Sequence, residues 1–187
     1  QGDNRKALGM LGDSTFFHSG ITGLVDIVHA NSNVIACILD NSITAMTGHQ
    51  ENPGTSVSLM GEPAQSIDIL SVVRSTGISE DRIRVVDPVD IEAMDAALDD
   101  AIKAEGPFII ITKRPCVLIK EVAKTYANKY CEIDQEKCKK CKACLRLACP
   151  AIANIDGAIS IYDKASCTAC GLCMQVCKFD AISKVGE

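Results

Sequence analysis

The chain has 187 residues, of which 47% are hydrophobic and 23% are charged, and its formal net charge is −5. This apolar content excludes a disordered chain. The acidic balance argues against nucleic-acid binding, and no apolar run reaches the ~18 residues that a membrane-spanning helix requires. Cysteine is the unusual residue, because eight of the 11 cysteines lie between positions 138 and 177.

Residues 1–112 alternate short apolar runs with segments of helical periodicity. The apolar runs predict strands over residues 6–11, 33–39, 83–86 and 108–111. One helix is predicted after the first strand and a second over residues 67–75. A third is predicted from Pro88 onwards, with one apolar face made of Ile91, Met94, Leu98 and Ile102. This alternation predicts an α/β domain in which helices flank a parallel sheet.

Polar residues follow the first two predicted strands. Gly12-Asp13-Ser14 comes after the first strand and opens a helix expected to begin near Thr15, and Asp40-Asn41 comes after the second. Because the carboxyl ends of adjacent parallel strands meet at one edge of a sheet, these residues should lie close together. Backbone N–H groups at such a turn can bind an anion, and a carboxylate with an amide oxygen suits Mg²⁺. A flavodoxin-like domain without a metal is the alternative.

The segment from residue 40 to residue 62 has no regular period and is rich in glycine and proline. An irregular segment of this length inside a compact domain is usually functional. His49 in this segment, and His18 after the first motif, are candidates to contact a substrate, although a lone histidine is more often a loop or packing residue. His49 is the candidate catalytic residue.

The C-terminal tail contains an internal repeat. Cys138, Cys141 and Cys144 recur 29 residues later as Cys167, Cys170 and Cys173. A fourth cysteine follows each triplet: Cys149, and 28 residues later Cys177. A repeat this short predicts a pseudo-symmetric module whose halves cannot hold a core alone.

Three cysteines at this spacing are typical of a [4Fe–4S] cluster, whose fourth ligand comes from the other repeat in two-cluster ferredoxins. The spacing therefore assigns one cluster to Cys138, Cys141, Cys144 and Cys177, and the other to Cys167, Cys170, Cys173 and Cys149. A disulfide framework is disfavoured by the odd cysteine count and by an N-terminus unlike an export signal. Zinc would favour paired Cys-x2-Cys units. Cys37, Cys116 and Cys131 are expected to be structural, with a reactive role as the alternative for Cys116 and Cys131, which flank the linker.

These patterns divide the chain into three parts. We expect a diphosphate- and magnesium-binding domain over residues 1–117 that lacks its N-terminal part, a linker over 118–131, and a two-cluster domain over 132–187. Four lysines surround the first triplet: Lys137, Lys139, Lys140 and Lys142. They form either a solvated charged face or a docking site for an acidic electron carrier.

The pattern Gly-Asp-(Gly/Ser)-x26-Asn resembles the diphosphate-binding motif of thiamine-diphosphate enzymes. This resemblance implies that Asp13, the Asn41 side chain and the Ile43 carbonyl bind Mg²⁺. It also implies that residues around the two motifs contact the cofactor diphosphate: Gly12, Ser14, Thr15 and Thr44. The tail resembles a bacterial-type two-cluster ferredoxin, with Lys178 where proline normally follows the last cysteine. The implied fold is a thiamine-diphosphate-binding α/β domain followed by a small α+β ferredoxin-like domain.

Together, the two halves resemble the C-terminal portion of the large subunit of indolepyruvate ferredoxin oxidoreductase, most closely over residues 12–21 and 39–50. The resemblance implies oxidative decarboxylation of arylpyruvates to acyl-coenzyme A and CO₂, with electrons passing through two [4Fe–4S] clusters to ferredoxin. Other 2-oxo acids, such as pyruvate, phenylglyoxylate or a branched-chain acid, stay open as substrates. A non-enzymatic electron-transfer module also stays open.

The same resemblance implies partners outside this sequence. The acid that activates the cofactor belongs to a pyrimidine-binding domain, so we expect that domain in the rest of the large subunit or in a split partner. A small (beta) subunit, coenzyme A and a 2-oxo acid complete the expected set, with no nucleic acid and no membrane. Oxygen-sensitive clusters of this kind suggest an anaerobic, cytoplasmic setting.

Overall fold

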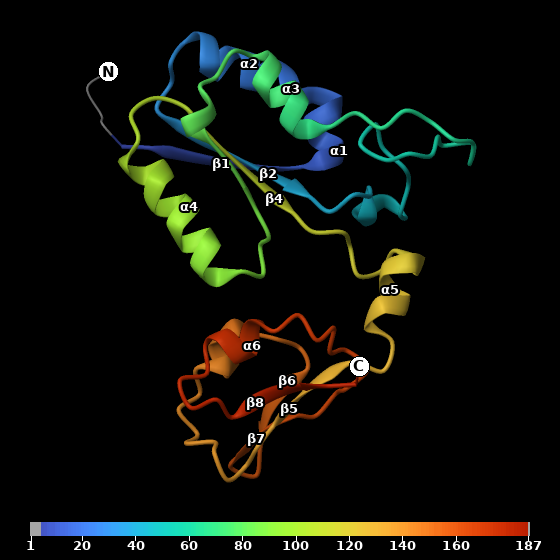
Figure 1. Cartoon of the computed structure of the whole chain (residues 1–187), viewed down its shortest axis with the longest axis vertical. Helices are drawn as coiled ribbons and strands as arrows, with labels where there is room; N and C mark the ends of the chain where they lie inside the picture. Colours follow the sequence, from blue (N-terminus) through green and yellow to red (C-terminus); the bar gives the residue numbers. More distant parts are fainter. Residues whose placement is uncertain (1–4, 187) are drawn as a thin grey trace. The chain divides into compact units, whose positions relative to one another are not determined.

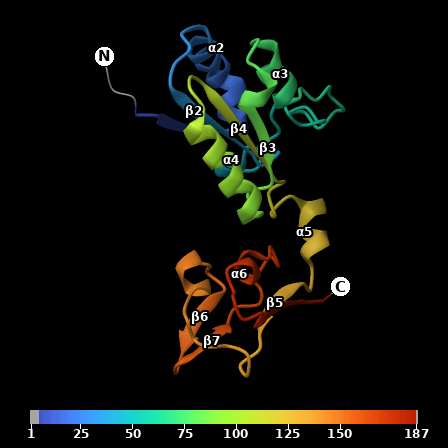
Figure 2. The same cartoon turned by 60° about the vertical axis from the view of Figure 1, so that its left-hand side comes forward.

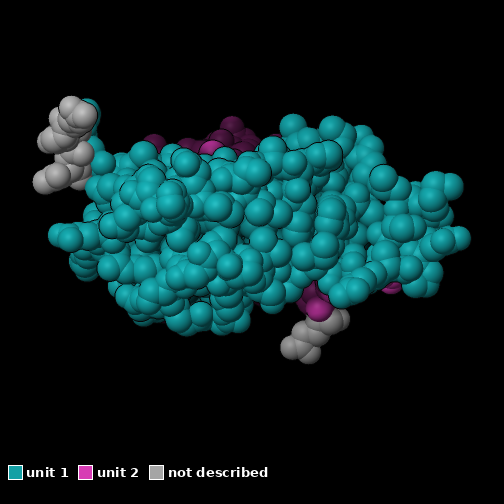
Figure 3. All heavy atoms as spheres, turned by 90° about the horizontal axis from the view of Figure 1, so that it is seen from above, with its two compact units in different colours: residues 1–119 teal, residues 120–187 magenta. Residues whose placement is uncertain are grey.

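The computed structural model describes residues 5–186 and divides the chain into two compact units, Gln1–Ile119 and Lys120–Glu187 (Figures 1 and 3). Each unit is described by itself. The predicted linker over 118–131 contains helix α5 (Lys120–Tyr126) and the first two residues of strand β5 (Tyr130–Ile133). Both elements belong to the second unit. None of the helices in residues 5–186 has the length and apolar content needed to cross a bilayer.

The first unit is built on a four-stranded sheet in the order β1-β2-β4-β3. Its strands are β1 (Ala7–Gly12), β2 (Val34–Asp40), β3 (Ile83–Val86) and β4 (Phe108–Lys113). Every neighbouring pair is parallel, which confirms the predicted fold class. Gly12 lies opposite Leu39 in the register of β1 and β2, so the two predicted motifs start from the same edge of the sheet.

Helices cover both faces of this sheet (Figures 1 and 2). Helix α2 (Ile21–His29) and helix α3 (Ile69–Ser75) pack on one face, where Leu24, Val73 and Ile109 belong to one buried core cluster. Helix α4 (Ile91–Lys103) packs on the other face, where Ala97 and Ala101 contact Ile110 and Phe108 in a second cluster. Buried strands with both faces covered are expected to be almost continuously apolar, as β4 is.

Helix starts differ from the sequence predictions. The helix expected from Pro88 begins at Ile91, because the Asp90 carboxylate caps it by accepting a hydrogen bond from the Ala93 N–H at 3.0 Å. Its apolar face is also narrower than predicted, since Ile102 is 65% exposed. A short 3-10 turn, η3 (Glu80–Arg82), precedes β3.

The first helical segment begins at Asp13 and not near Thr15. It consists of α1 (Asp13–Thr15), the π-helical turn η1 (Phe16–Gly20) and then α2, without a break. A π-helical turn inside a helix is rare and is frequently found at functional sites. The site described below lies at the first residue of this segment.

The irregular segment after β2 contains one 3-10 turn, η2 (Ala45–Thr47), and isolated bridges pair Thr44 with Gln50 and Val57 with Pro63. Hydrogen bonds of the segment to itself hold its shape. The Asn52 carbonyl accepts from the Thr55 N–H at 2.9 Å, and the Pro53 carbonyl accepts from the Ile67 N–H at 2.9 Å. The prediction of a long segment with little regular structure is therefore correct.

The second unit contains two antiparallel pairs of short strands. Strand β5 pairs with β8 (Ile182–Val185), and β6 (Ile152–Ile155) pairs with β7 (Ala158–Ile161). The 3-10 turn η4 (Cys144–Leu147) begins at the last cysteine of the first triplet, and helix α6 (Leu172–Gln175) contains the last cysteine of the second. Its buried cluster combines isoleucines with cysteines. A two-stranded pair has little independent stability, and this buried cluster includes residues of all four strands.

Candidate functional site

Asp13, Asn41 and Ile43 converge at the edge where β1 and β2 end. Asp13 is only 4% exposed, and its Oδ1 accepts a hydrogen bond from the Ser14 N–H at 2.8 Å. The Ile43 N–H donates to Asn41 Oδ1 at 3.1 Å and also lowers the pKa of Asp13. The structure therefore brings together the three residues that the motif assigns to Mg²⁺.

The electrostatic surroundings of Asp13 suit a divalent cation. Burial raises the pKa of Asp13, hydrogen bonds from Ser14 and Asn52 lower it, and the nearby Asp40 carboxylate raises it further. Within residues 5–186, the ion pair nearest this site joins Lys113 to Asp40 at 3.8 Å, and no such pair includes Asp13. A buried carboxylate without a cationic partner is costly. A hard cation with oxygen ligands would compensate that charge.

Asn52 is a site residue that the sequence patterns did not identify. Its side chain is buried, and its Nδ2 donates a hydrogen bond to Asp13 Oδ2 at 3.1 Å across 39 residues of sequence. Its Oδ1 accepts from the Gly54 N–H at 2.8 Å, which joins Asp13 to the irregular segment. A single asparagine in an aperiodic stretch carries no motif, so only the fold reveals this contact.

Replacing Asn52 with alanine is expected to weaken magnesium and thiamine-diphosphate binding by about 10- to 100-fold, the usual effect of removing a partner that orients a metal ligand. Asp13 would lose the donor that orients its second oxygen. Isothermal titration calorimetry measures the change. Ser66→Ala is the matched control, because Ser66 Oγ donates to the Gly54 carbonyl at 2.8 Å and anchors the same segment without touching Asp13. An equal loss in both variants would contradict a specific role for Asn52.

A pocket of about 350 Å³ opens next to Asn52, and its lining includes Ser14, His18 and Glu51. Sequence analysis placed His18 second to His49 as a candidate for substrate contact. His49 does not line this pocket: it lies exposed in a turn with φ +62°, directly after Gly48 with φ +116°. Of the two histidines, His18 is thus the one that shares a pocket with Ser14 and Asn52, the neighbours of Asp13.

The remaining motif residues surround the start of the helix. Gly12 is the extended residue before α1, with no atom within 4 Å of where a Cβ would stand. Thr15 is exposed in α1, and Thr44 donates its N–H to the Gln50 carbonyl at 2.9 Å. The roles of these three residues and Ser14 toward the diphosphate stay predictions.

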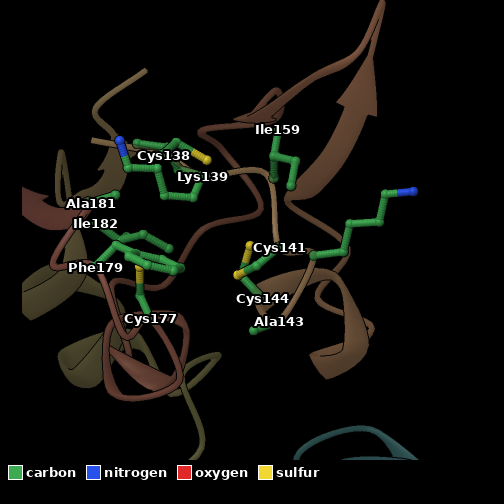
Figure 4. A pocket seen from close by; sticks show the side chains of 12 residues that line it. Cys138, Lys139, Cys141, Ala143, Cys144, Ile159, Cys177, Phe179, Ala181 and Ile182 are labelled. Carbon is green, nitrogen blue, oxygen red and sulfur yellow. The ribbon is translucent and has the colours of Figure 1, made fainter. Parts of the chain in front are cut away.

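Four cysteines line a pocket in the second unit, and they are the four assigned to the first cluster: Cys138, Cys141, Cys144 and Cys177 (Figure 4). The fourth comes from the far end of the other repeat, as crossed ligation predicts. Ile133, Ile159, Phe179 and two lysines, Lys139 and Lys142, are also in the lining. The free volume of this pocket is about 20 Å³.

A second pocket, of about 330 Å³, is lined by the other assigned set: Cys149, Cys167, Cys170 and Cys173. A fifth cysteine, Cys131, also lines it. The Cys131 N–H donates to Cys167 Sγ at 3.3 Å. A hydrogen bond with the Cys173 thiol lowers the pKa of Cys131 to about 6 and raises the pKa of Cys173. The sequence patterns do not predict that Cys131 lies in this pocket, and its structural role stays a prediction.

As the side chains lie, no three His, Cys, Asp or Glu residues in the described part of the chain are arranged around a single metal ion. A [4Fe–4S] cluster makes a different demand, because each of its four irons takes one thiolate and the thiols stay apart. Two separate sets of four cysteines, each around its own apolar pocket, fit that donor requirement.

Both cysteine triplets have the same backbone shape. The residue before the second cysteine has a left-handed φ, +54° at Lys140 and +48° at Ala169. The residue after it does as well, +62° at Lys142 and +87° at Gly171. Such turns gather backbone N–H groups into a concave surface that binds anions. A reduced iron–sulfur cluster with four thiolates is an anion of this kind.

Comparison with known families agrees with this division of the chain. Residues 1–112 match the thiamine pyrophosphate enzyme, C-terminal TPP binding domain. Residues 160–183, which contain the second cysteine triplet, match the 4Fe-4S binding domain. The two matches fall on the parallel-sheet unit and on the cysteine-rich unit respectively.

Curated relatives cover nearly the whole chain. It is 36% identical to the indolepyruvate oxidoreductase subunit IorA of Methanothermobacter marburgensis over 98% of its length, and 38% identical to the Pyrococcus abyssi IorA over 95%. It spans only 29% and 28% of those relatives.

A solved structure, the thiamine diphosphate-dependent 4-hydroxybenzoylformate decarboxylase of Rhodococcus jostii RHA1, is 22% identical with a TM-score of 0.41, covering 59% of this chain and 20% of that one. The family match extends over more than half of the sequence, and the expected resemblance is confirmed. The chain belongs to the thiamine pyrophosphate enzymes, with the C-terminal TPP-binding domain of that family followed by a 4Fe-4S binding domain.

Proposed function

We propose that this chain is part of a thiamine-diphosphate-dependent 2-oxoacid oxidoreductase that converts arylpyruvates such as indolepyruvate to acyl-coenzyme A and CO₂. The observation that carries this proposal is its similarity to IorA subunits over 95–98% of its length. The joining of a TPP-binding domain to a cysteine-rich unit supports it.

In this proposal the first unit holds the cofactor by its diphosphate. Asp13, Asn41 Oδ1 and the Ile43 carbonyl would bind Mg²⁺, and Asn52 would fix the orientation of Asp13. The cofactor itself supplies the electron sink that decarboxylation needs. His18 would lie beside the substrate pocket, where its ring could exchange a proton with a bound substrate.

The second unit would carry the electrons away. Two clusters held by Cys138, Cys141, Cys144, Cys177 and by Cys167, Cys170, Cys173, Cys149 would accept single electrons in turn and pass them to ferredoxin. The apolar linings of the two pockets support this role. Limited contact with water is one of the factors that set the potential of a cluster.

The chain would supply only part of an active site. Its relatives are more than three times as long as the stretch that it matches, and thiamine enzymes need an acid beside the aminopyrimidine ring. We propose that this acid, with its pyrimidine-binding domain, lies in the rest of the large subunit or in a split partner. A small subunit and a cytoplasmic location complete the proposal.

The test uses the native complex, isolated without oxygen. Viologen reduction is followed with coenzyme A, thiamine diphosphate and one substrate at a time: indolepyruvate, phenylpyruvate, pyruvate or 2-oxoisovalerate. Preference for the two arylpyruvates is expected. Preference for pyruvate or 2-oxoisovalerate would keep the chemistry and reject the substrate class. No turnover with any substrate, in a complex with clusters and cofactor bound, would instead favour a simple electron-transfer module.

The lysines around the first pocket give a prediction about ferredoxin. Lys139, Lys140 and Lys142 are exposed on the loop beside this pocket, whereas Lys137 lies 3.8 Å from Asp134. Changing Lys139 and Lys142 to glutamate should raise the KM for ferredoxin about threefold to tenfold with kcat unchanged, because charges at the rim of an interface mainly steer association. Lys124→Glu, on α5, is the control. An unchanged KM at low salt would mean that the lysines form only a solvated face.

A further inference from the structure

The two cysteine triplets share one backbone shape but carry different side chains. Three of the four positions inside the first triplet are lysines, whereas their counterparts in the second are small and uncharged: Lys139, Lys140 and Lys142 against Thr168, Ala169 and Gly171. Gly171 adopts φ +87° without strain, but Lys142 holds the same position at φ +62°, where a side chain costs free energy. The turn itself therefore does not explain this lysine.

The two pockets differ in charge as well. Lys139 (Figure 4) and Lys142 line the first pocket, whereas none of the described residues that line the second is charged. Lys139, Lys140 and Lys142 are exposed, and within residues 5–186 the lysine of this region that forms an ion pair is Lys137. Since the chain as a whole carries −5, this concentration of positive charge is local to the first pocket.

An aromatic side chain distinguishes the first pocket further. After its fourth cysteine, the first repeat reaches its Ala-Ile pair through Pro150 alone, whereas the second passes through three residues: Lys178, Phe179 and Asp180. Phe179 is 42% exposed and lines the first pocket (Figure 4), and the charges of its two neighbours offset each other. Aromatic residues of this kind are enriched among the anchors of protein interfaces.

The first set of cysteines also lies closer to the surface. Among the eleven cysteines, all within residues 5–186, Cys141 alone is exposed, and its counterpart Cys170 is partly buried. A protein seated over the first pocket would thus approach a ligand of the first cluster directly. Four residues surround this point and are called the basic rim: Lys139, Lys140, Lys142 and Phe179.

We propose that electrons leave this unit through the first cluster, and that an acidic electron-carrier protein docks on the basic rim to receive them. The inference rests on the proposed two-cluster function and adds which of the two clusters meets the carrier. In each transfer the reduced first cluster gives up one electron and the carrier gains one. The second cluster then supplies the first with its next electron, and no bond or proton is exchanged.

The first measurement is the binding of an oxidised, acidic ferredoxin to the anaerobically isolated native complex, by calorimetry at low and at high salt. The test variant gives the first triplet the side chains of the second: Lys139→Thr, Lys140→Ala and Lys142→Gly. The control variant removes the same charge from three exposed lysines of α4 and α5: Lys103→Ala, Lys120→Ala and Lys124→Ala. Neither variant alters a cysteine.

At low salt, affinity should fall about tenfold in the test variant, at the lower end of the effect of charge steering. In the control it should change by less than about twofold, because exposed charges far from the interface are screened. High salt should remove the difference between the two variants. Phe179→Ala should weaken binding about fivefold at both salt concentrations, because it removes an apolar anchor and no charge.

The second measurement identifies the cluster that meets the carrier. The complex is reduced with dithionite, the excess is removed, and reduction of ferredoxin is followed by stopped-flow absorbance. Cys141→Ala/Cys177→Ala, which removes the first cluster, should lose transfer to ferredoxin and still reduce methyl viologen, a small cation that lysines do not attract. Cys149→Ala/Cys170→Ala, which removes the second cluster, should still reduce ferredoxin.

Three results would overturn the inference: unchanged affinity in the test variant, equal weakening in the control variant, or transfer to ferredoxin that survives loss of the first cluster and not loss of the second. Should a cysteine variant lose all its iron, the lysine variants still decide the docking site. A native complex without two four-iron clusters would refute the proposed function itself, and an iron count made beforehand distinguishes that failure from the others.

Discussion

Thiamine diphosphate and Mg²⁺ binding should fall more than about 100-fold in an Asp13→Asn variant, because loss of a partner that merely orients a ligand already costs 10- to 100-fold. Asp13 is the buried carboxylate at the start of the helix, and the Ser14 N–H and the Asn52 side chain donate hydrogen bonds to its two oxygens. An amide of the same size keeps one of these oxygens but removes the negative charge that attracts the cation. Calorimetry with both ligands measures the loss.

Two controls accompany this variant. Asp26→Asn removes an exposed carboxylate from α2 in the same unit and should leave binding unchanged. The iron–sulfur absorbance of the second unit should be the same in both variants, which shows that the chain has folded. Retained binding in Asp13→Asn would refute the assignment of Asp13 to the cation.

The pKa of Asp13 adds a dependence on pH. Since burial raises this pKa above 3.8, a proton competes with Mg²⁺ at a higher pH than it would at an ordinary aspartate. As the solution is acidified, cofactor affinity should therefore begin to fall at a pH that is still above 3.8. The stability of the protein without a cation depends on pH in the opposite direction. Its free energy of unfolding falls as pH rises through the folded-state pKa of Asp13, because the buried carboxyl group then becomes charged.

The second large effect is expected when pairs of cysteines are removed to test crossed ligation of the clusters. The double variant Cys141→Ala/Cys177→Ala should retain one intact cluster, about four iron atoms per chain, because both cysteines belong to the same set. The pair Cys141→Ala/Cys149→Ala should lose both clusters, because it removes one ligand from each pocket. Iron and sulfide analysis with electron paramagnetic resonance measures the difference.

The two double variants remove the same number of thiols, so each is the control for the other. Uncrossed ligation, in which each repeat binds its own cluster, would reverse the result: the second pair would retain a cluster and the first would lose both. Equal iron content in the two variants would contradict both arrangements.

Most of the fold could be predicted from the sequence. Apolar runs located all four strands of the first unit, because a strand buried on both faces needs continuous hydrophobic residues. Helix starts were harder to predict, since Asp90 takes the capping position two residues after the proline that was expected to open the helix. Local side-chain hydrogen bonding decides such boundaries, and periodicity does not describe it.

The candidate site also contains some residues that the sequence predicted and others that it did not. Asp13, Asn41 and the eight cysteines belong to fixed spacings, and the structure brings them together as those spacings predict. Asn52 and Cys131 belong to no spacing. Each reaches its partner through tertiary folding, across 39 residues to Asp13 and 36 residues to Cys167. Sequence patterns describe neighbours along the chain, so contacts of this kind become visible only in three dimensions.

The pairing of β5 with β8 joins residues 130–133 to residues 182–185, and this has a consequence for biosynthesis. A chain emerging from the ribosome exposes all the cysteines of the second pocket by residue 173, but the first pocket also needs Cys177 and Ile182. On the proposed two-cluster function, the thiols of the second pocket are therefore all synthesised before the last thiol of the first. Strand β5 pairs with β8 only after both sets of cysteines have been made.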